Sequence, residues 1–264
     1  MNVSVKHFSP HSLLLPYVES YTLRKINLNN GTTIDKLMPY RTLASIEFFL
    51  ATPHKEFDLH TMQKKRTITS TARGFRTFSK YKIQISENFL SLTVKFRPSG
   101  MFGLLGIPLN HLTNEDVSLN ELKVLPVSDI EQRLQEVTNE SDYRSILDEY
   151  LLKLYKQRTF NMRLQPFLSS GYGAIDITAI ASELGISVRQ TERLFLNEIG
   201  LSFVKWRQLK KFEAAINHKM ETPDTSWTDL AYQFNFYDQP DFNTQFKKYL
   251  GIIPSRFSPS DFAF

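Results

Sequence analysis

The C-terminal part of the sequence repeats one pattern twice, and this repeat constrains the fold more than any other feature. Each copy has a short segment with apolar side chains at helical spacing, a turn residue, and a capping residue that begins a second helical segment. In the first copy, residues 178–195, Gly185 occupies the turn because glycine adopts positive φ without penalty. Ser187 is placed to cap the next helix, and Gln190 completes a capping box. Residues 178–195 are therefore predicted to form two short helices joined by a tight turn.

The second copy, residues 227–246, follows the same logic with different residues. Asn235 occupies the turn, since asparagine tolerates the left-handed conformation better than most residues. Asp238 is the predicted cap, and Pro240 falls in the first helical turn, where its missing N–H costs little. Apolar side chains at helical spacing over residues 206–220 predict a longer helix that links the two copies. Its buried side is predicted to consist of Trp206, Leu209, Ile216 and Met220.

The second helix of each copy carries polar side chains opposite its apolar face. In the first copy these side chains are Arg189, Glu192, Arg193 and Asn197. In the second copy they are Gln239, Asn243, Thr244 and Lys247. A helix that enters the major groove of DNA needs such a donor-bearing face, because sequence is read there by hydrogen bonds to base edges. The repeated pattern therefore predicts two DNA-reading helices.

On these residues, the segment 160–264 resembles the DNA-binding domain of AraC/XylS-type transcription regulators. The first copy matches the pattern of that family through Ala181, Gly185, Ser187, Arg193 and Phe195. The second copy matches through Phe236, Gln239, Phe242, Phe246, Lys247, Gly251, Pro254 and Phe257. The stretch 96–113 also resembles the N-terminal domain of a subset of these regulators. The resemblance implies that two recognition helices enter successive major-groove segments on one face of DNA, roughly 34 Å apart.

The resemblance also implies a role for each polar residue. The groove contacts of the first unit would be Arg189, Glu192 and Arg193, of which Arg193 can bind guanine bidentately. The equivalent positions in the second unit are Gln239, Pro240 and Thr244. The residues expected near the phosphates are Ser187, Asn243 and Lys247.

Three residues depart from the family pattern. Thr191 replaces a large apolar residue, which is expected to loosen its helix. Thr244 stands where the family often has arginine, and Pro240 offers no donor. The second unit is therefore expected to contribute shape and backbone contacts more than base reading. Residues 165–264 also carry slightly more acidic than basic side chains, so one monomer is expected to bind DNA modestly and a homodimer more tightly.

The N-terminal part has a different pattern. Segments 43–50 and 89–96 have the length and composition of strands, and residues 29–31 and 98–100 are typical of turns. They predict an antiparallel sheet that could close into a barrel. Helical spacing begins near residue 127, where Ser128 followed by Glu131 predicts a capped helix start. A second helical stripe follows, which either packs on its own domain or forms a dimer face: Tyr143, Ile146, Leu147, Tyr150, Leu151 and Leu154.

Composition excludes several classes of protein. The 264 residues include no cysteine, which excludes disulfides, cysteine-based metal sites and a cysteine nucleophile. No apolar run approaches about 18 residues and the N-terminus lacks the apolar core of a signal peptide, so we expect a cytoplasmic protein without membrane spans. The net charge of +5 comes from the N-terminal part. DNA binding by the C-terminal part must therefore use a local patch.

Two N-terminal segments each allow two interpretations. His54, Glu56, Asp58 and His60 alternate, so in a strand they would share one face, either as ligands of a zinc-like ion or, as we favour, as a solvated face. Segment 64–82 contains basic residues and no acidic ones, which predicts either an anion site or a solvated face, the latter being favoured. Within it, residues 73–76 are the best candidates for ligand contact. The basic side chains are Lys64, Lys65, Arg66, Arg73, Arg76, Lys80 and Lys82.

Together these features predict an α+β chain. A mixed domain, residues 1–158, with an antiparallel sheet and helices precedes an all-α domain, residues 160–264, with two helix-turn-helix units. The expected function is sequence-specific binding of a promoter, with the first domain sensing a small-molecule effector, mediating dimerisation, or both. No catalytic residue, cofactor or metal is expected. The rival interpretations are a metal-dependent enzyme regulated by DNA and an interaction module that has lost DNA binding.

Overall fold

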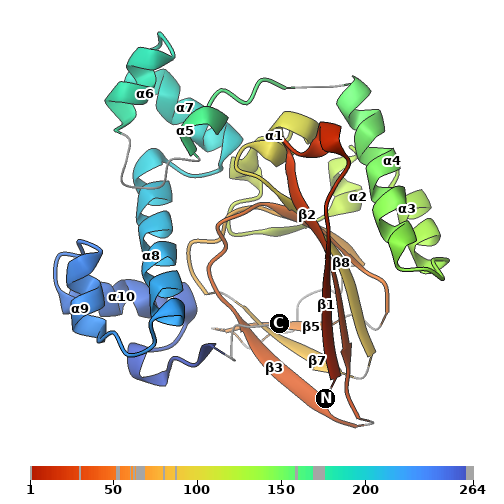
Figure 1. Ribbon diagram of the computed structural model, residues 1–264, viewed down its shortest axis with the longest axis horizontal. Helices are drawn as coiled ribbons and strands as arrows, with labels where there is room; N and C mark the ends of the chain where they lie inside the picture. Colours follow the sequence, from red (N-terminus) through yellow and green to blue (C-terminus); the bar gives the residue numbers. More distant parts are fainter. Residues whose placement is uncertain are drawn as a thin grey trace.

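A computed structural model describes residues 2–29, 31–51, 54–59, 61, 63, 69–79, 81–86, 88–157, 160–168 and 176–259. Over these residues, a sheet-rich N-terminal domain is followed by an all-helical C-terminal domain (Figure 1). The predicted fold class, an antiparallel sheet domain followed by a helical domain with two helix-turn-helix units, is confirmed. None of the helices in the described ranges is long and apolar enough to cross a bilayer.

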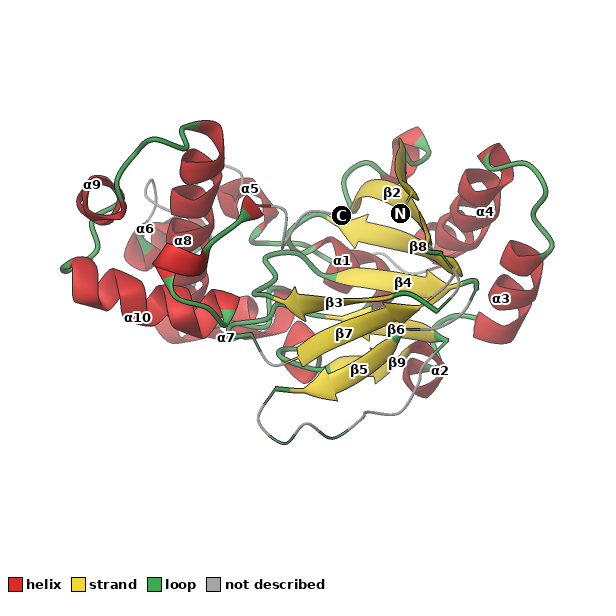
Figure 2. Cartoon of the chain, turned by 90° about the horizontal axis from the view of Figure 1, so that it is seen from below, coloured by secondary structure: helices red, strands yellow, loops and turns green. Residues whose placement is uncertain are grey.

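The described strands of the N-terminal domain form two antiparallel sheets (Figure 2). The larger sheet has the order β1-β2-β8-β4-β6-β9, with bounds Asn2–Phe8, Val18–Asn27, Asn88–Phe96, Ser45–Phe49, Ser70–Arg73 and Asp116–Ser118. The smaller sheet has the order β3-β7-β5, with bounds Thr33–Met38, Tyr81–Ser86 and Lys55–Asp58. The two predicted strand segments, 43–50 and 89–96, become β4 and β8, which pair with each other.

Successive side chains of β4 and β8 point to opposite faces of the sheet, and the two faces differ in polarity. On one face, Ile46 lies opposite Val94 and Phe48 opposite Leu92, and all four side chains belong to a core shared with helices. On the other face, the cross-strand pairs are polar, Ser45 with Lys95 and Glu47 with Thr93. The sheet therefore has an apolar outer face and a partly polar inner face.

Helices α3 (Val127–Gln135) and α4 (Ser141–Gln157) cover the outer face of the larger sheet, on the side away from the C-terminal domain (Figure 2). Five members of the predicted stripe are buried there and Leu154 is partly buried, so the stripe packs on its own domain. The predicted capped start at Ser128 is wrong. Helix α3 begins at Val127 after Pro126, which places Ser128 inside the first turn, and no side chain caps it.

The remaining helices described in the N-terminal domain are short. They are η1 (Ser12–Leu14), α1 (Gly100–Leu105), η2 (Leu109–His111) and α2 (Leu119–Leu122). The C-terminal domain contains α5 (Gln165–Leu168), α6 (Ile177–Glu183), α7 (Val188–Glu198), α8 (Phe203–Glu221), α9 (Trp227–Gln233), α10 (Gln239–Leu250) and η3 (Pro254–Arg256).

Aromatic side chains hold the C-terminal helices together. Phe195 of α7 packs against Trp206 of α8, and Phe212 of α8 packs against Phe242 and Phe246 of α10. Helix α8 therefore carries α6 and α7 near one end and α9 and α10 near the other (Figure 1). Its 19 residues span about 28 Å at 1.5 Å per residue.

The predicted linking helix is confirmed, with one error in its buried side. Trp206, Leu209 and Ile216 are buried as expected. The prediction for Met220 is wrong, because its side chain is 50% exposed and lines a pocket between the domains.

Candidate functional site

Each helix-turn-helix unit turns at the residue that the sequence predicts. Gly185 has φ +63° and Asn235 has φ +55°, both in the left-handed region. The turn at Asn235 is held further by Lys211 of α8, whose Nζ donates to the Asn235 carbonyl at 3.0 Å and lies 4.1 Å from the centre of the Phe236 ring. The sequence around Asn235 does not indicate this contact, because Lys211 lies on a different helix.

Helix α7 begins with the predicted capping box. The Ser187 hydroxyl accepts from the Gln190 N–H, and the Gln190 side chain accepts from the Ser187 N–H at 2.9 Å. Arg189 and Arg193 are exposed on this helix. Thr191 is fully buried, and its hydroxyl donates to the Ser187 carbonyl at 3.2 Å. The threonine hydroxyl is therefore satisfied within the helix, at the position where loosening was expected.

Glu192 lies at the junction of two helices. One of its carboxylate oxygens accepts a hydrogen bond from the backbone N–H of Phe203, the first residue of α8, at 3.2 Å. The first N–H groups of a helix have no partner within the helix, so this contact satisfies one of them. The residue therefore ties α7 to the linking helix.

Helix α10 begins with the predicted cap, because the Asp238 side chain accepts from the Asp241 N–H at 2.7 Å. Gln239, Pro240 and Lys247 are exposed and Asn243 is half-buried. The Thr244 hydroxyl donates to the Pro240 carbonyl at 2.9 Å. The Thr244 hydroxyl is therefore used as a donor inside the helix.

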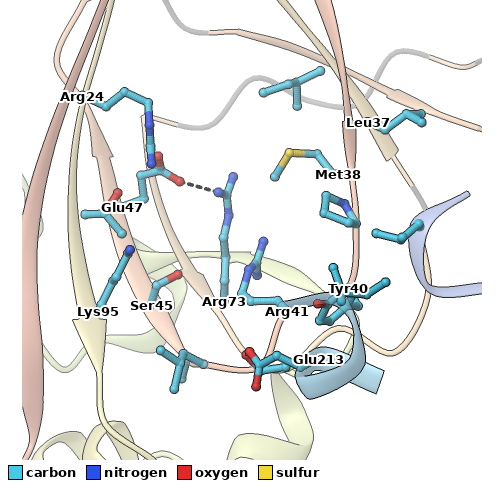
Figure 3. A pocket seen from close by; sticks show the side chains of 18 of the residues that line it. Arg24, Leu37, Met38, Tyr40, Arg41, Ser45, Glu47, Arg73, Lys95 and Glu213 are labelled. Carbon is cyan, nitrogen blue, oxygen red and sulfur yellow. Dashed lines mark hydrogen bonds and ion pairs between the residues drawn. The ribbon is translucent and has the colours of Figure 1, made fainter. Parts of the chain in front are cut away.

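A pocket of about 630 Å³ opens between the inner face of the sheets and the C-terminal domain (Figure 3). Its cationic lining residues are Arg24, Arg41, Arg73 and Lys95, and its carboxylates are Glu47 and Glu213. Its apolar lining includes Met38, Phe49, Ile83, Ile85 and Phe89. The C-terminal domain contributes α8, the end of α10 and the segment after it. The pocket thus combines an excess of positive charge with an apolar wall.

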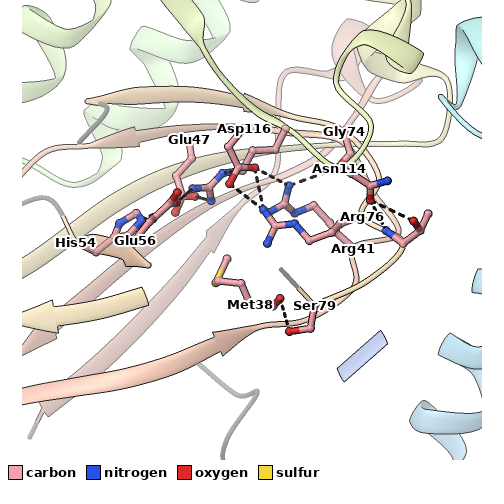
Figure 4. A network of polar contacts seen from close by, with 12 residues as sticks. Met38, Arg41, Glu47, His54, Glu56, Gly74, Arg76, Ser79, Asn114 and Asp116 are labelled. Atoms are coloured by element: carbon pink, nitrogen blue, oxygen red, sulfur yellow. Dashed lines mark hydrogen bonds and ion pairs between the residues drawn. The ribbon is translucent and has the colours of Figure 1, made fainter. Parts of the chain in front are cut away.

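A network of buried, charged side chains lies beside the pocket (Figure 4). The Asp116 carboxylate accepts two hydrogen bonds from Arg76, at 2.9 and 2.8 Å, and lies 3.5 Å from Arg73 Nε and 3.6 Å from Arg41 Nη1. Arg73 also pairs with Glu47. Burial, followed by repulsion from Arg76, lowers the pKa of Arg41 to about 9. An anion in the pocket would stabilise the charged form of this guanidinium.

The favoured interpretation of segment 64–82 as a solvated face is wrong for Arg73 and Arg76, which are 4% and 1% exposed. Their carboxylate partners come from β4 and β9, far away in the sequence. Lys82 pairs with Asp35 at 2.7 Å. Lys64, Lys65, Arg66 and Lys80 lie outside the described residues.

The comparison with protein families decides what the two helical units are. Residues 180–259 match the family model described as "Helix-turn-helix domain". These residues are an AraC-type helix-turn-helix domain. The match confirms the resemblance that the sequence motifs indicated, for this part of the chain.

Comparisons over the whole chain give weaker likenesses. ToxT from Vibrio cholerae with an unsaturated fatty acid bound has a TM-score of 0.45 and 14% identity, covering 89% of this chain and 93% of that chain. The AraC-like transcriptional activator CuxR has a TM-score of 0.25 and 15% identity, covering 81% of this chain and 86% of that chain. These TM-scores are below 0.5 and do not establish a shared arrangement. No curated protein sequence matches the chain.

The AraC-type domain is attached to the N-terminal domain at the end of α7. The Thr113 hydroxyl donates to the Gly200 carbonyl at 2.7 Å. Gly200 has φ +88°, and a Cβ atom there would lie 2.4 Å from the Thr113 hydroxyl oxygen, so only glycine fits. From the N-terminal side, Phe75 inserts into the core of the AraC-type domain and is 1% exposed.

The possible metal site is not assembled in the described part of the chain. His54 is buried beside Phe49, and its Nε2 lies 3.0 Å from Glu56 Oε1. Because His54 is buried, the favoured solvated-face interpretation is wrong for this residue. His60 lies outside the described residues. Among the described residues, no group of three or more histidine, cysteine, aspartate and glutamate side chains could hold a metal ion.

Proposed function

We propose that this chain is a sequence-specific DNA-binding transcription regulator that places α7 and α10 in successive major-groove segments of a promoter. The observation that carries this proposal is the presence of two complete capped units on one linking helix. The length of α8, about 28 Å, is close to the roughly 34 Å between successive groove segments. We also propose that the N-terminal domain spans residues 1–158, that the DNA-binding domain spans residues 160–264, and that the protein is cytoplasmic. No enzymatic activity is proposed.

We assign the residues of the two recognition helices to different tasks. In α7, Arg189 and Arg193 read base edges, and Glu192 lies at the groove while it holds the N-terminus of α8. In α10, Gln239, Pro240 and Thr244 follow the groove mainly through shape, since the Thr244 hydroxyl is already bonded. The residues assigned to the phosphate backbone are Ser187, Asn243 and Lys247.

The test is a binding selection from a random duplex library at about 0.15 M salt, a concentration at which non-specific phosphate attraction is partly screened. The proposal predicts an enriched motif with two elements about one helical turn apart. Symmetry within the motif would also indicate whether the chain binds as a homodimer. Enrichment of a single short element would contradict the use of two recognition helices.

The N-terminal pocket is proposed to bind a small-molecule effector with an anionic head group and an apolar body. Arg41 and Lys95 face the same space as Ile83 and Phe89, which suits a carboxylate joined to a hydrocarbon chain. Calorimetry with decanoate and decanol tests this chemistry. Binding of decanoate but not decanol supports it, and equal binding of both would contradict the role of the charge.

A further inference from the structure

The C-terminal end of α10 is completed by the N-terminal domain. The last carbonyls of a helix have no partners within it. The carbonyl of Lys248 accepts a hydrogen bond from the Ser79 N–H at 2.9 Å, and the carbonyl of Tyr249 accepts one from the Tyr40 N–H at 2.8 Å. Gly251 follows with φ +78°, and a Cβ atom there would lie 2.9 Å from the Ser79 hydroxyl oxygen. The two domains are thus in close backbone contact at the end of this recognition helix.

The side chain of Tyr40 reinforces the same contact. Its ring lies 5.3 Å from the ring of Phe212 on α8 and 6.0 Å from the ring of Tyr249 on α10, in edge-to-face geometry. Burial also raises the pKa of Tyr40. The residue is therefore wedged between the linking helix and the recognition helix.

The segment that carries Tyr40 also forms one wall of the pocket (Figure 3). Met38, Tyr40 and Arg41 line the cavity, and the Met38 carbonyl accepts a hydrogen bond from the Ser79 hydroxyl at 3.2 Å. The Thr42 hydroxyl donates to Glu213 of α8, a residue of the C-terminal domain that also lines the cavity. A molecule in the pocket would therefore touch the segment 38–42 that holds α10.

The first helix-turn-helix unit has a separate anchor. Helix α7 is held through Thr113 and Gly200, and neither of these residues lines the pocket. Among the described lining residues, none comes from α6 or α7. The pocket is therefore in direct contact with the supports of one recognition helix and not with those of the other.

We infer that Tyr40 is a positioning residue for α10, through which the N-terminal domain controls the second DNA-reading unit without acting on the first. This inference rests on the proposed function. A ligand shifts an equilibrium only through different contacts in two states, and the wall at residues 38–42 is where such contacts would reach α10. The DNA segment bound by α10 is then the regulated part of the promoter site.

The experiment compares full-length wild type with the variants Tyr40→Ala, Tyr40→Phe and Thr113→Val. Each protein is titrated with three duplexes, which contain both selected elements, the first alone or the second alone. The first element is the one whose binding Arg193→Ala weakens. Tyr40→Ala should weaken binding of the second element at least fivefold and leave the first within twofold. Tyr40→Phe, which keeps the ring, should behave as wild type, and Thr113→Val should weaken only the first element.

Hydrogen exchange of the free proteins supplies a readout that does not depend on DNA. Tyr40→Ala should accelerate amide exchange in α10 at least tenfold and leave α7 unchanged. Equal effects on both helices, or none on α10, would overturn the inference. If wild type binds no duplex, the proposed function fails. The hydrogen-exchange experiment still tests whether Tyr40 positions α10. Tyr40→Leu, which keeps an apolar side chain in place, substitutes for Tyr40→Ala if that variant does not fold.

Discussion

The buried carboxylate of Glu198, the last residue of α7, accepts a hydrogen bond from the backbone N–H of Leu164 at 3.1 Å. The other carboxylate oxygen accepts one from the N–H of Arg163, also at 3.1 Å. These bonds connect a recognition helix to the segment through which the chain enters the helical domain. Burial raises the pKa of Glu198, against the effect of the hydrogen bonds from the Leu164 and Arg163 N–H groups.

Replacing this carboxylate should destabilise the protein. Glu198→Ala leaves two buried N–H groups without their acceptor, which costs about 1–3 kcal/mol for each group. Urea unfolding followed by circular dichroism measures the change. Glu183→Ala, at an exposed position on α6, is the matched control and should change the free energy of unfolding by less than about 0.5 kcal/mol. Equal effects of the two substitutions would show that the contact has no structural importance.

Arg193 is predicted to provide a base contact from α7. Arg193→Ala should weaken binding to the selected duplex by about 1–3 kcal/mol and relax the preference at one base pair. Lys156→Ala, at an exposed position on α4, should change the affinity little. Anisotropy titrations against the selected duplex and its single-base variants measure both quantities. An unchanged affinity with an intact fold would refute the assignment.

A substitution at Thr244 is predicted to increase the affinity for DNA. Its hydroxyl is bonded to the Pro240 carbonyl, so Thr244→Val should leave DNA affinity within about twofold, since no donor to DNA is lost. Thr244→Arg adds a cation to an exposed position and should raise the affinity. If the new side chain meets a phosphate, the slope of log K against log salt should steepen by about 0.9. An arginine variant with the affinity and salt slope of wild type would show that this face of α10 does not meet DNA.

Lys95 tests the chemistry of the pocket. Lys95→Met keeps the length of the side chain and removes its charge, so decanoate should bind about tenfold or more weakly, because a hydrogen bond to a charged group contributes about 1.5–3 kcal/mol. Lys82→Met removes a lysine that pairs with Asp35 and does not line the pocket, and should bind decanoate as wild type does. Equal losses in the two variants would argue against a specific site.

Glu47 makes the stability of the protein depend on pH. Burial would raise the pKa of Glu47, but the charges of Arg73, Arg24 and His54 lower it below its ordinary value. A carboxylate with a lowered pKa stabilises the folded state above its unfolded pKa, and this contribution is lost as the pH falls through the folded pKa. Glu47→Gln should therefore be less stable than wild type at pH 7, and the difference should shrink below about pH 4.5.

Unfolding titrations from about pH 7 to about pH 3, a range that spans ordinary carboxyl pKa values, provide the measurement. Glu19→Gln, at an exposed position on β2, is the control and should follow wild type throughout. A constant difference between Glu47→Gln and wild type over the whole range would contradict the role of the charge.

The features that the sequence predicts correctly are those carried by neighbouring residues. The turns at Gly185 and Asn235 and the caps at Ser187 and Asp238 each depend on a few adjacent side chains, and all four are found. Ser128 shows the limit of this logic. A cap at Ser128 predicts that the helix begins at residue 129, whereas it begins two residues earlier, at Val127, with Pro126 in the capping position.

Features that depend on distant partners cannot be predicted from the local sequence. Arg76 looks like a solvated charge until β9 brings Asp116 to it. The sequence pattern places Glu192 on the polar face of α7, but it cannot show that the carboxylate also accepts a hydrogen bond from the Phe203 N–H of α8. The contact of Tyr40 with the end of α10 joins residues from different domains, so no periodicity or spacing could indicate it. All of the residues proposed to contact DNA could be named from the sequence, whereas the contacts from distant elements that hold their helices in place could not.

The most direct test of the central claim is a hydroxyl-radical footprint of the full-length protein on a selected duplex. Two recognition helices on one linking helix should protect two segments on the same face of the DNA, about one helical turn apart, for each bound chain. Arg193→Ala should reduce protection in one of these segments only. A single protected segment for each chain, or no protection at concentrations that saturate binding, would contradict the claim that this protein reads DNA with both units.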